Sequence, residues 1–194
     1  MSEESVPASF VSTLQALSDW LETERIPHIT IGGVAVSLLA KPRATQDIDA
    51  VIWLEENRWE EFLRVGERYG FIPRLSGALE FAAKARVFLL KHQESGISVD
   101  ISCGALEFEK EMIERAATLA IGPLQLRVPT PEDLIITKAV AHRSKDLIDI
   151  ETILGFYQNL DLSRIRHWVS EFAMALETPE ISENLEKLLE RYTR

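Results

Sequence analysis

Cysteine is almost absent from the sequence, because Cys103 is the only one among 194 residues. A lone cysteine excludes an intrachain disulfide and any zinc site built from several cysteines, and it is typical of a reducing compartment. The four histidines show no metal-ligand spacing, and the G-x-S-x-G and H-E-x-x-H motifs are missing. These absences argue against disulfide scaffolds, zinc proteases and serine hydrolases.

Long apolar runs and an excess of positive charge are also missing. The most apolar stretch, residues 29–40, contains two glycines and is shorter than the about 20 residues that span a bilayer. The N-terminus is acidic, so we expect no signal peptide, no membrane association and a soluble cytoplasmic protein. With 21 Lys and Arg against 31 Asp and Glu, the net charge of -10 argues against a broad basic surface for nucleic acid.

The sequence contains a mixed pattern of strands and helices that changes to helices alone after about residue 130. We expect strands over residues 28–31, 47–53, 86–91, 97–102, 118–121 and 124–128, and helices over residues 9–24, 34–40, 57–69 and 105–115. From Pro131 onward only helical patterns follow, with breaks near Arg143, Leu160 and Pro179. The sequence therefore predicts an α+β core over residues 1–129, with a C-terminal helical region over residues 130–194 packed on it.

Three aspartates are placed on two of the expected strands. Asp47 and Asp49 are two residues apart, so their side chains project from one face of the sheet. Asp100 alternates with apolar neighbours on a later strand and would complete a triangle of carboxylates if the two strands are adjacent. Such carboxylates repel one another unless a cation shares the site, and oxygen ligands favour Mg²⁺ or Mn²⁺. The alternative is that these are solvated residues at the ends of strands.

A pair of glycines lies between the first expected strand and the helix after it. Backbone N–H groups of Gly32 and Gly33, together with the helix N-terminus, can hold a phosphate. The alternative is a tight turn that only glycine can form. Because Asp47 and Asp49 follow about fourteen residues later, we favour a phosphate site beside a pair of metal ions.

A lysine on an apolar helical stripe is the second unusual feature. Thr130 and Pro131 predict a helix start, and Lys138 shares the inward-facing stripe of the helix that follows. Burial of an unpaired ammonium group is costly, so Lys138 requires an anionic partner, either a phosphate or one of the strand carboxylates. The alternative is that its stem extends along the helix and carries the charge to solvent.

Taken jointly, these motifs resemble the nucleotidyltransferase superfamily with the DNA polymerase β-type core. The resemblance is carried by Ile31-Gly32-Gly33, by the run Arg43-Ala44-Thr45-Gln46-Asp47-Ile48-Asp49 and by Val99-Asp100-Ile101. The R-x-T-x-D-I-D run is similar to that of the AbiEii-type toxin branch and its uncharacterised relatives. The resemblance implies a nucleotidyltransferase-fold mixed sheet flanked by helices and followed by a C-terminal helical bundle.

The resemblance also implies a set of functional residues. Asp47, Asp49 and Asp100 would bind two magnesium ions, with manganese as a substitute, and the Gly32-Gly33 turn would hold the triphosphate of an NTP. AbiEii-like chains carry a lysine at the place of Lys138 and a later Lys-Asp-x-x-Asp run, which here is Lys145-Asp146-Leu147-Ile148-Asp149. Many members carry a hydroxyl residue after the first glycine, whereas Gly33 and Val34 have none.

The predicted function is therefore Mg²⁺-dependent transfer of a nucleoside monophosphate from an NTP to an acceptor hydroxyl. Asp47, Asp49 and Asp100 are the predicted catalytic residues, and the predicted nucleotide contacts are Gly32, Gly33, Arg43, Lys138, Lys145 and Asp146. The acceptor is left open between an RNA end such as that of tRNA, a protein and a small molecule. The acidic net charge suits a small cationic acceptor better than a long RNA. Lys138 and the Lys145-Asp146 pair nevertheless lead us to favour a toxin-like protein with a cognate antitoxin.

Two other classes compete with this interpretation. The first is a non-catalytic protein of the same fold that binds a partner as an antitoxin or scaffold, which the absent hydroxyl after Gly32 supports. The second is a two-metal nuclease or phosphatase, which uses similar carboxylates but does not explain the paired glycines.

Overall fold

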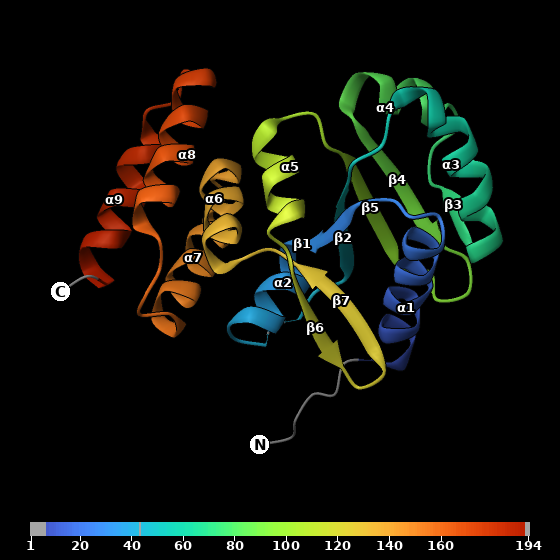
Figure 1. Cartoon of the computed structure of the whole chain (residues 1–194), viewed down its shortest axis with the longest axis horizontal. Coiled ribbons are helices and arrows are strands. Elements are labelled where there is room, and N and C mark those ends of the chain that lie inside the picture. Colours follow the sequence, from blue (N-terminus) through green and yellow to red (C-terminus); the bar gives the residue numbers. More distant parts are fainter. Residues whose placement is uncertain (1–6, 43, 193–194) are drawn as a thin grey trace. The chain divides into compact units, whose positions relative to one another are not determined.

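The computed structural model describes residues 7–42 and 44–192 (Figure 1). Arg43, one of the predicted nucleotide contacts, lies outside the described residues. The chain divides into two compact units. Unit 1 extends to Gly33 and resumes over Ala44–Val128, and unit 2 contains the segment that begins at Val34 together with the residues from Pro129 onward.

Unit 1 is built on a mixed sheet that contains both aspartate-bearing strands. The sheet is formed by β1 (His28–Ile31), β2 (Asp47–Ile52), β3 (Phe71–Pro73), β4 (Val87–His92) and β5 (Ser98–Cys103), in the order β1-β2-β5-β4-β3 (Figure 1). The pair β2–β5 is parallel, whereas β1–β2, β5–β4 and β4–β3 are antiparallel. Every second residue of β5 is buried, as expected for a strand with one covered face.

The helices of unit 1 bury one aromatic cluster against this sheet. They are α1 (Ala8–Thr23), α3 (Trp59–Gly66) with the 3-10 turns η1 (Glu56–Arg58) and η2 (Glu67–Tyr69), α4 (Ala78–Ala85) and α5 (Glu107–Glu114). Trp20 of α1 stacks on Phe62 of α3, with 4.3 Å between ring centroids, and on Phe71 of β3 at 5.4 Å. A separate hairpin, β6 (Ala117–Ile121) and β7 (Leu124–Val128), completes the unit.

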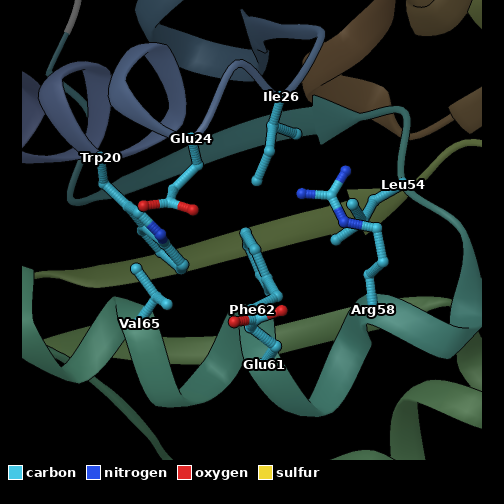
Figure 2. Close-up of a pocket in the computed structure, with 8 residues that line it drawn as sticks. All are labelled: Trp20, Glu24, Ile26, Leu54, Arg58, Glu61, Phe62 and Val65. Atoms are coloured by element: carbon cyan, nitrogen blue, oxygen red, sulfur yellow. The ribbon is translucent and has the colours of Figure 1, made fainter.

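A shallow pocket opens beside this aromatic cluster. Figure 2 shows the residues that line its space of about 220 Å³: Trp20, Glu24, Ile26, Leu54, Arg58, Glu61, Phe62 and Val65. Leu54 follows the C-terminal end of β2, whereas Asp47 begins that strand, so the pocket and the aspartates belong to opposite ends of β2. The pocket is smaller than the about 300 Å³ of the smallest typical ligand sites.

Unit 2 consists of helices. They are α6 (Pro131–Ala141), α7 (Ser144–Phe156), α8 (Leu162–Ala175) and α9 (Glu180–Tyr192), and α2 (Gly32–Leu39) begins in unit 1 and continues into unit 2. Thr130 caps α6, since its hydroxyl accepts a hydrogen bond from the Asp133 N–H at 3.2 Å. The Tyr157 hydroxyl donates to the carbonyl of Leu39 at 2.7 Å and ties the end of α2 to the helices of this unit.

The predicted α+β class is confirmed, and the predicted strands and helices agree with the observed ones to within a few residues. Sequence reasoning missed β3 and α4, which fill residues 71–85. The strand has three residues and contains a proline, and α4 starts after a left-handed Gly77, so neither has a strong periodic pattern. The predicted boundary at residue 129 stays a prediction, and in the structure the segment that begins at Val34 groups with the C-terminal helices.

Among the described residues, every helix is too short or too polar to serve as a membrane span.

Candidate active site

The register of β2 and β5 brings the three aspartates to one face of the sheet. Asp49 lies opposite Asp100 across this parallel pair, and Asp47 lies opposite Ser98. Side chains alternate between the faces of a strand, so Asp47, Asp49 and Asp100 project from the same face. Ile48 and Val99 project from the other face and are fully buried. The sheet therefore places the three carboxylates on one face of two adjacent strands.

The glycine bend lies directly against one of these carboxylates. Gly32 has a φ of +65°, and a Cβ added to it would lie 2.0 Å from Oδ2 of Asp49. A side chain is therefore excluded here by contact as well as by backbone conformation. Because Ile31 pairs with Asp49 across β1 and β2, the bend follows the strand that neighbours the aspartates. The turn and the Asp49 carboxylate are therefore in direct contact.

Asp47 is held by a residue of the predicted motif. The Thr45 hydroxyl lies 3.1 Å from Oδ1 of Asp47 and 3.2 Å from its carbonyl oxygen. Asp47 is exposed, whereas Asp49 and Asp100 are half-buried. The threonine of the R-x-T-x-D run therefore orients the outermost carboxylate, a role that the sequence analysis did not assign.

Asp100 has a cationic partner that the sequence analysis also missed. Arg74 follows β3, and its guanidinium donates to the Asp100 carboxylate and lies 3.4 Å from the Ser98 hydroxyl. Burial raises the pKa of Asp100 above its ordinary value; Arg74 lowers that pKa and Asp47 raises it further. No sequence motif marks Arg74, because its partner is 26 residues away and the strand before it was not predicted.

The donor chemistry of this site fits a hard divalent cation. Asp47, Asp49 and Asp100 offer carboxylate oxygens, which Mg²⁺ and Mn²⁺ prefer, and neither histidine nor the buried Cys103 thiol is needed. Burial raises the pKa of Cys103 to about 12, so this thiol is protonated at neutral pH. In the arrangement shown, the described residues include no group of three His, Cys, Asp or Glu side chains that is ready to hold a metal ion.

A second charged cluster is buried among the helices of unit 2. Lys138 of α6 is 4% exposed, and its Nζ lies 3.0 Å from Oδ1 of Asp146 and 2.8 Å from Oδ2 of Asp149. Both aspartates belong to α7 and are themselves buried. The anionic partners of Lys138 are therefore two helix carboxylates, rather than the phosphate or strand carboxylates that we expected.

Arg143 extends this cluster to the surface. Its Nε lies 2.5 Å from Oδ2 of Asp146, and its backbone N–H also donates to that oxygen at 3.3 Å. Burial alone would raise the pKa of Asp146, but the hydrogen bonds from Arg143 and Lys138 outweigh it and hold this pKa below its ordinary value. Lys145, the neighbouring basic residue, is exposed. The nucleotide contacts assigned to Lys138, Lys145 and Asp146 stay predictions.

One family model covers almost the whole chain. The model described as "Nucleotidyltransferase of unknown function (DUF6036)" matches residues 10–193. The comparison with curated proteins gives no match.

Solved structures with the same fold include nucleotidyltransferase-like proteins and antibiotic adenylyltransferases. An antigenic nucleotidyltransferase-like protein from Paracoccidioides brasiliensis has a TM-score of 0.56 at 16% identity, over 93% of this chain and 94% of its own. The antibiotic-resistance factor ANT(2'')-Ia has a TM-score of 0.59 at 14% identity, over 90% and 97%. The lincosamide antibiotic adenylyltransferase LnuA has 0.52 at 14%, over 78% and 98%. At these identities the likeness establishes a shared fold.

Proposed function

Since the chain belongs to the DUF6036 family of nucleotidyltransferases, we propose that it transfers a nucleoside monophosphate from an NTP to a hydroxyl group of a small-molecule acceptor. The observation that carries this proposal is the contact between the glycine bend and the paired strands. Gly32 abuts Asp49, and Asp49 lies opposite Asp100. The turn that would bind phosphate and the carboxylates that would bind metal are thereby adjacent, which supports transfer of a phosphoryl-linked group.

The residues of unit 1 divide the reaction between them. Gly32 and Gly33 bind the triphosphate through backbone N–H groups at the start of α2. Asp47, oriented by Thr45, and Asp49 would hold two Mg²⁺ ions, which neutralise charge on the triphosphate when bound. Asp100, opposite Asp49 on the same face of the sheet, would share one of these ions and help to take up the proton of the acceptor hydroxyl.

The chemical step is one substitution at phosphorus. The acceptor oxygen forms a bond to the α-phosphorus, the bond from that phosphorus to the bridging oxygen of the β-phosphate breaks, and pyrophosphate leaves. The hydroxyl proton goes to the carboxylate of Asp100 and then to solvent. No oxidant or reductant takes part, so the reaction needs only the NTP, the acceptor and the divalent ions.

The adenylyltransferases among the solved structures support a small-molecule acceptor. ANT(2'')-Ia was solved with adenylyl-2''-tobramycin and LnuA with lincomycin, and both ligands are small molecules. The net charge of -10 also favours such an acceptor over a long RNA. An RNA or protein acceptor, as in a toxin with a cognate antitoxin, is the second candidate, and the AbiEii-like run that ends in Asp47-Ile48-Asp49 supports it.

Transfer of a labelled nucleotide tests the proposal and identifies the acceptor class. The protein is incubated with each α-labelled NTP, Mg²⁺ and a cell extract, which is then separated into small molecules, RNA and protein. Label on small molecules supports the proposal, whereas label on RNA or protein supports the second candidate. Free labelled nucleoside monophosphate without a labelled acceptor indicates a nuclease or phosphatase. Absence of NTP binding at millimolar concentration in calorimetry indicates a non-catalytic scaffold.

Substitution of a carboxylate ties this activity to the site. We expect Asp49→Asn to reduce transfer more than about 100-fold. Loss of a residue that only hydrogen-bonds a metal ligand typically reduces activity about 10–100-fold, and loss of the ligand itself should reduce it further. Asp19→Asn removes an exposed carboxylate from α1 and serves as the matched control with unchanged transfer. Equal thermal unfolding of both variants and the parent excludes a folding defect. Full transfer by Asp49→Asn would refute the assignment.

A further inference from the structure

Arg74 belongs to a single row of residues that crosses the sheet. The row runs from Ile31 of β1 through Asp49 and Asp100 to Leu89 of β4, each opposite the next. The backbone N–H of Arg74 donates to the carbonyl of Leu89 at 2.8 Å, which places Arg74 next in the row. Its side chain reaches past Leu89 to the Asp100 carboxylate on the same face. The strand pairing therefore places the Arg74 guanidinium on the same face as the carboxylates and beside Asp100.

The ion pair is open to solvent and therefore weak. The side chains of Arg74 and Asp100 are 31% and 36% exposed. Loss of an ion pair this exposed changes the equilibrium constant for folding or binding by about two- to five-fold at most. In contrast, Lys138 and its partners Asp146 and Asp149 are no more than 5% exposed. A buried pair of that kind cannot be separated without a large loss of stability, whereas the Arg74–Asp100 pair can exchange partners.

The charges around Asp100 make an exchange of partners favourable. Asp47 acts on Asp100 as a like charge and Arg74 as an opposite charge. Arg74 therefore offsets part of the charge at Asp100, while Asp47 still repels it. A divalent cation carries twice the charge of Arg74 and can accept oxygens from several carboxylates at once.

We propose that Arg74 is an internal cation that competes with the divalent metal for Asp100. In the protein without metal, the guanidinium holds the Asp100 carboxylate and limits repulsion among the three aspartates. Metal binding requires that Asp100 exchange this partner for the ion. Arg74 is thus a positioning residue that sets the metal affinity of the site through Asp100. This inference rests on the proposed function, since it concerns the same carboxylates.

Binding of Mn²⁺ to the full-length protein tests the proposal without any measurement of activity. Electron paramagnetic resonance reports the free hexa-aqua Mn²⁺ ion, so a titration gives the dissociation constant. We expect Arg74→Ala to bind Mn²⁺ about two- to five-fold more tightly than the parent, because Asp100 is freed from its competing partner. Arg64→Ala, which removes an exposed arginine paired with Glu61 on α3, should leave the affinity unchanged.

A double-mutant cycle separates competition at Asp100 from a general effect of removed charge. In the Asp100→Asn background Arg74 has no carboxylate to hold, so Arg74→Ala should no longer tighten Mn²⁺ binding. A gain of the same size in both backgrounds would overturn the proposal, since Arg74 would then act only through its field. Unchanged or weaker binding by the single variant Arg74→Ala would overturn it as well.

The outcomes also distinguish this inference from the proposed function. If the parent binds Mn²⁺ and Arg74→Ala binds it equally well, the competition is refuted and the metal site stands. If Arg74→Ala binds Mn²⁺ and the parent does not, the competition is supported in its strongest form. If neither protein binds Mn²⁺ at millimolar concentration, both the metal site and the competition are refuted. Circular dichroism of each variant confirms that it is folded.

Discussion

At the scale of single residues, Gly32 is constrained both by its backbone conformation and by the side chain that packs against it. Its left-handed conformation aims the start of α2, and its missing side chain leaves room for the Asp49 carboxylate. A residue with a Cβ would therefore destabilise the protein in two ways, through an unfavourable φ and through a 2.0 Å contact with Asp49. Gly122 in the hairpin has a φ of +58° but meets nothing within 4 Å. Comparison of the two glycines therefore separates the cost of the backbone conformation from the cost of the steric contact.

We predict that Gly32→Ala lowers stability and also displaces Asp49, whereas Gly122→Ala lowers stability alone. The backbone term should cost each variant about 1–2 kcal/mol of unfolding free energy in urea titrations. Gly32→Ala should lose more than Gly122→Ala and should also lose Mn²⁺ and NTP affinity in calorimetry. Equal affinity in the two variants would show that Asp49 is not part of the binding site.

At the scale of secondary-structure elements, the helix pair α6–α7 is joined by charges in its interior. Lys138 meets Asp146 and Asp149, so removal of the lysine leaves two buried carboxylates without their common partner. Arg143 covers Asp146 from the surface: its side chain is 60% exposed, and its guanidinium also donates to Oδ1 of Asp146 at 3.2 Å. The cluster therefore has the features of a structural ion-pair network that joins two helices.

We predict that Lys138→Met destabilises the protein by about 3–5 kcal/mol, as expected when one partner of a buried ion pair is removed. The matched variant Lys145→Met replaces an exposed lysine in the first turn of α7. We expect it to change the free energy of unfolding by no more than about 0.5 kcal/mol. Urea unfolding followed by circular dichroism measures both. A Lys138→Met protein of normal stability that has lost NTP affinity would instead favour the triphosphate contact.

At the scale of the whole molecule, the chain leaves unit 1 at the glycine bend and returns to it before β2. The intervening segment begins at Val34 and belongs to the compact unit of the C-terminal helices. The end of α2 is held there by the hydrogen bond from the Tyr157 hydroxyl to the carbonyl of Leu39. The helix that starts at the proposed phosphate site is therefore continuous with the unit that contains the Lys138 cluster.

We predict that residues 34–39 open together with α6 and α7, rather than with the strands that flank them in sequence. Cooperative units of this kind share one opening free energy in native-state hydrogen exchange. In Lys138→Met, protection should fall over residues 34–39 and over α6 and α7, while β1 and β2 retain it. Protection of residues 34–39 that follows β1 and β2 in this variant would contradict the prediction.

The sequence predicted the parts of this protein that depend on local patterns. The alternation of polar and apolar residues around Asp47, Asp49 and Asp100 fixed which face each aspartate occupies. The pairing of two glycines between a strand and a helix indicated the bend at Gly32. The resemblance to the nucleotidyltransferase superfamily, based on these motifs, is confirmed by the family match over residues 10–193.

The tertiary structure decided which distant residues each of these groups meets. Arg74 can reach Asp100 because the order of the strands places the end of β3 beside β4 and β5. The sequence could not predict this, since β3 is too short to leave a periodic pattern. Lys138 was rightly expected to need an anion, but the choice of Asp146 and Asp149 depends on how α6 packs against α7. Periodicity records the face on which a side chain lies, whereas its partner across the fold is set by packing between segments far apart in the chain.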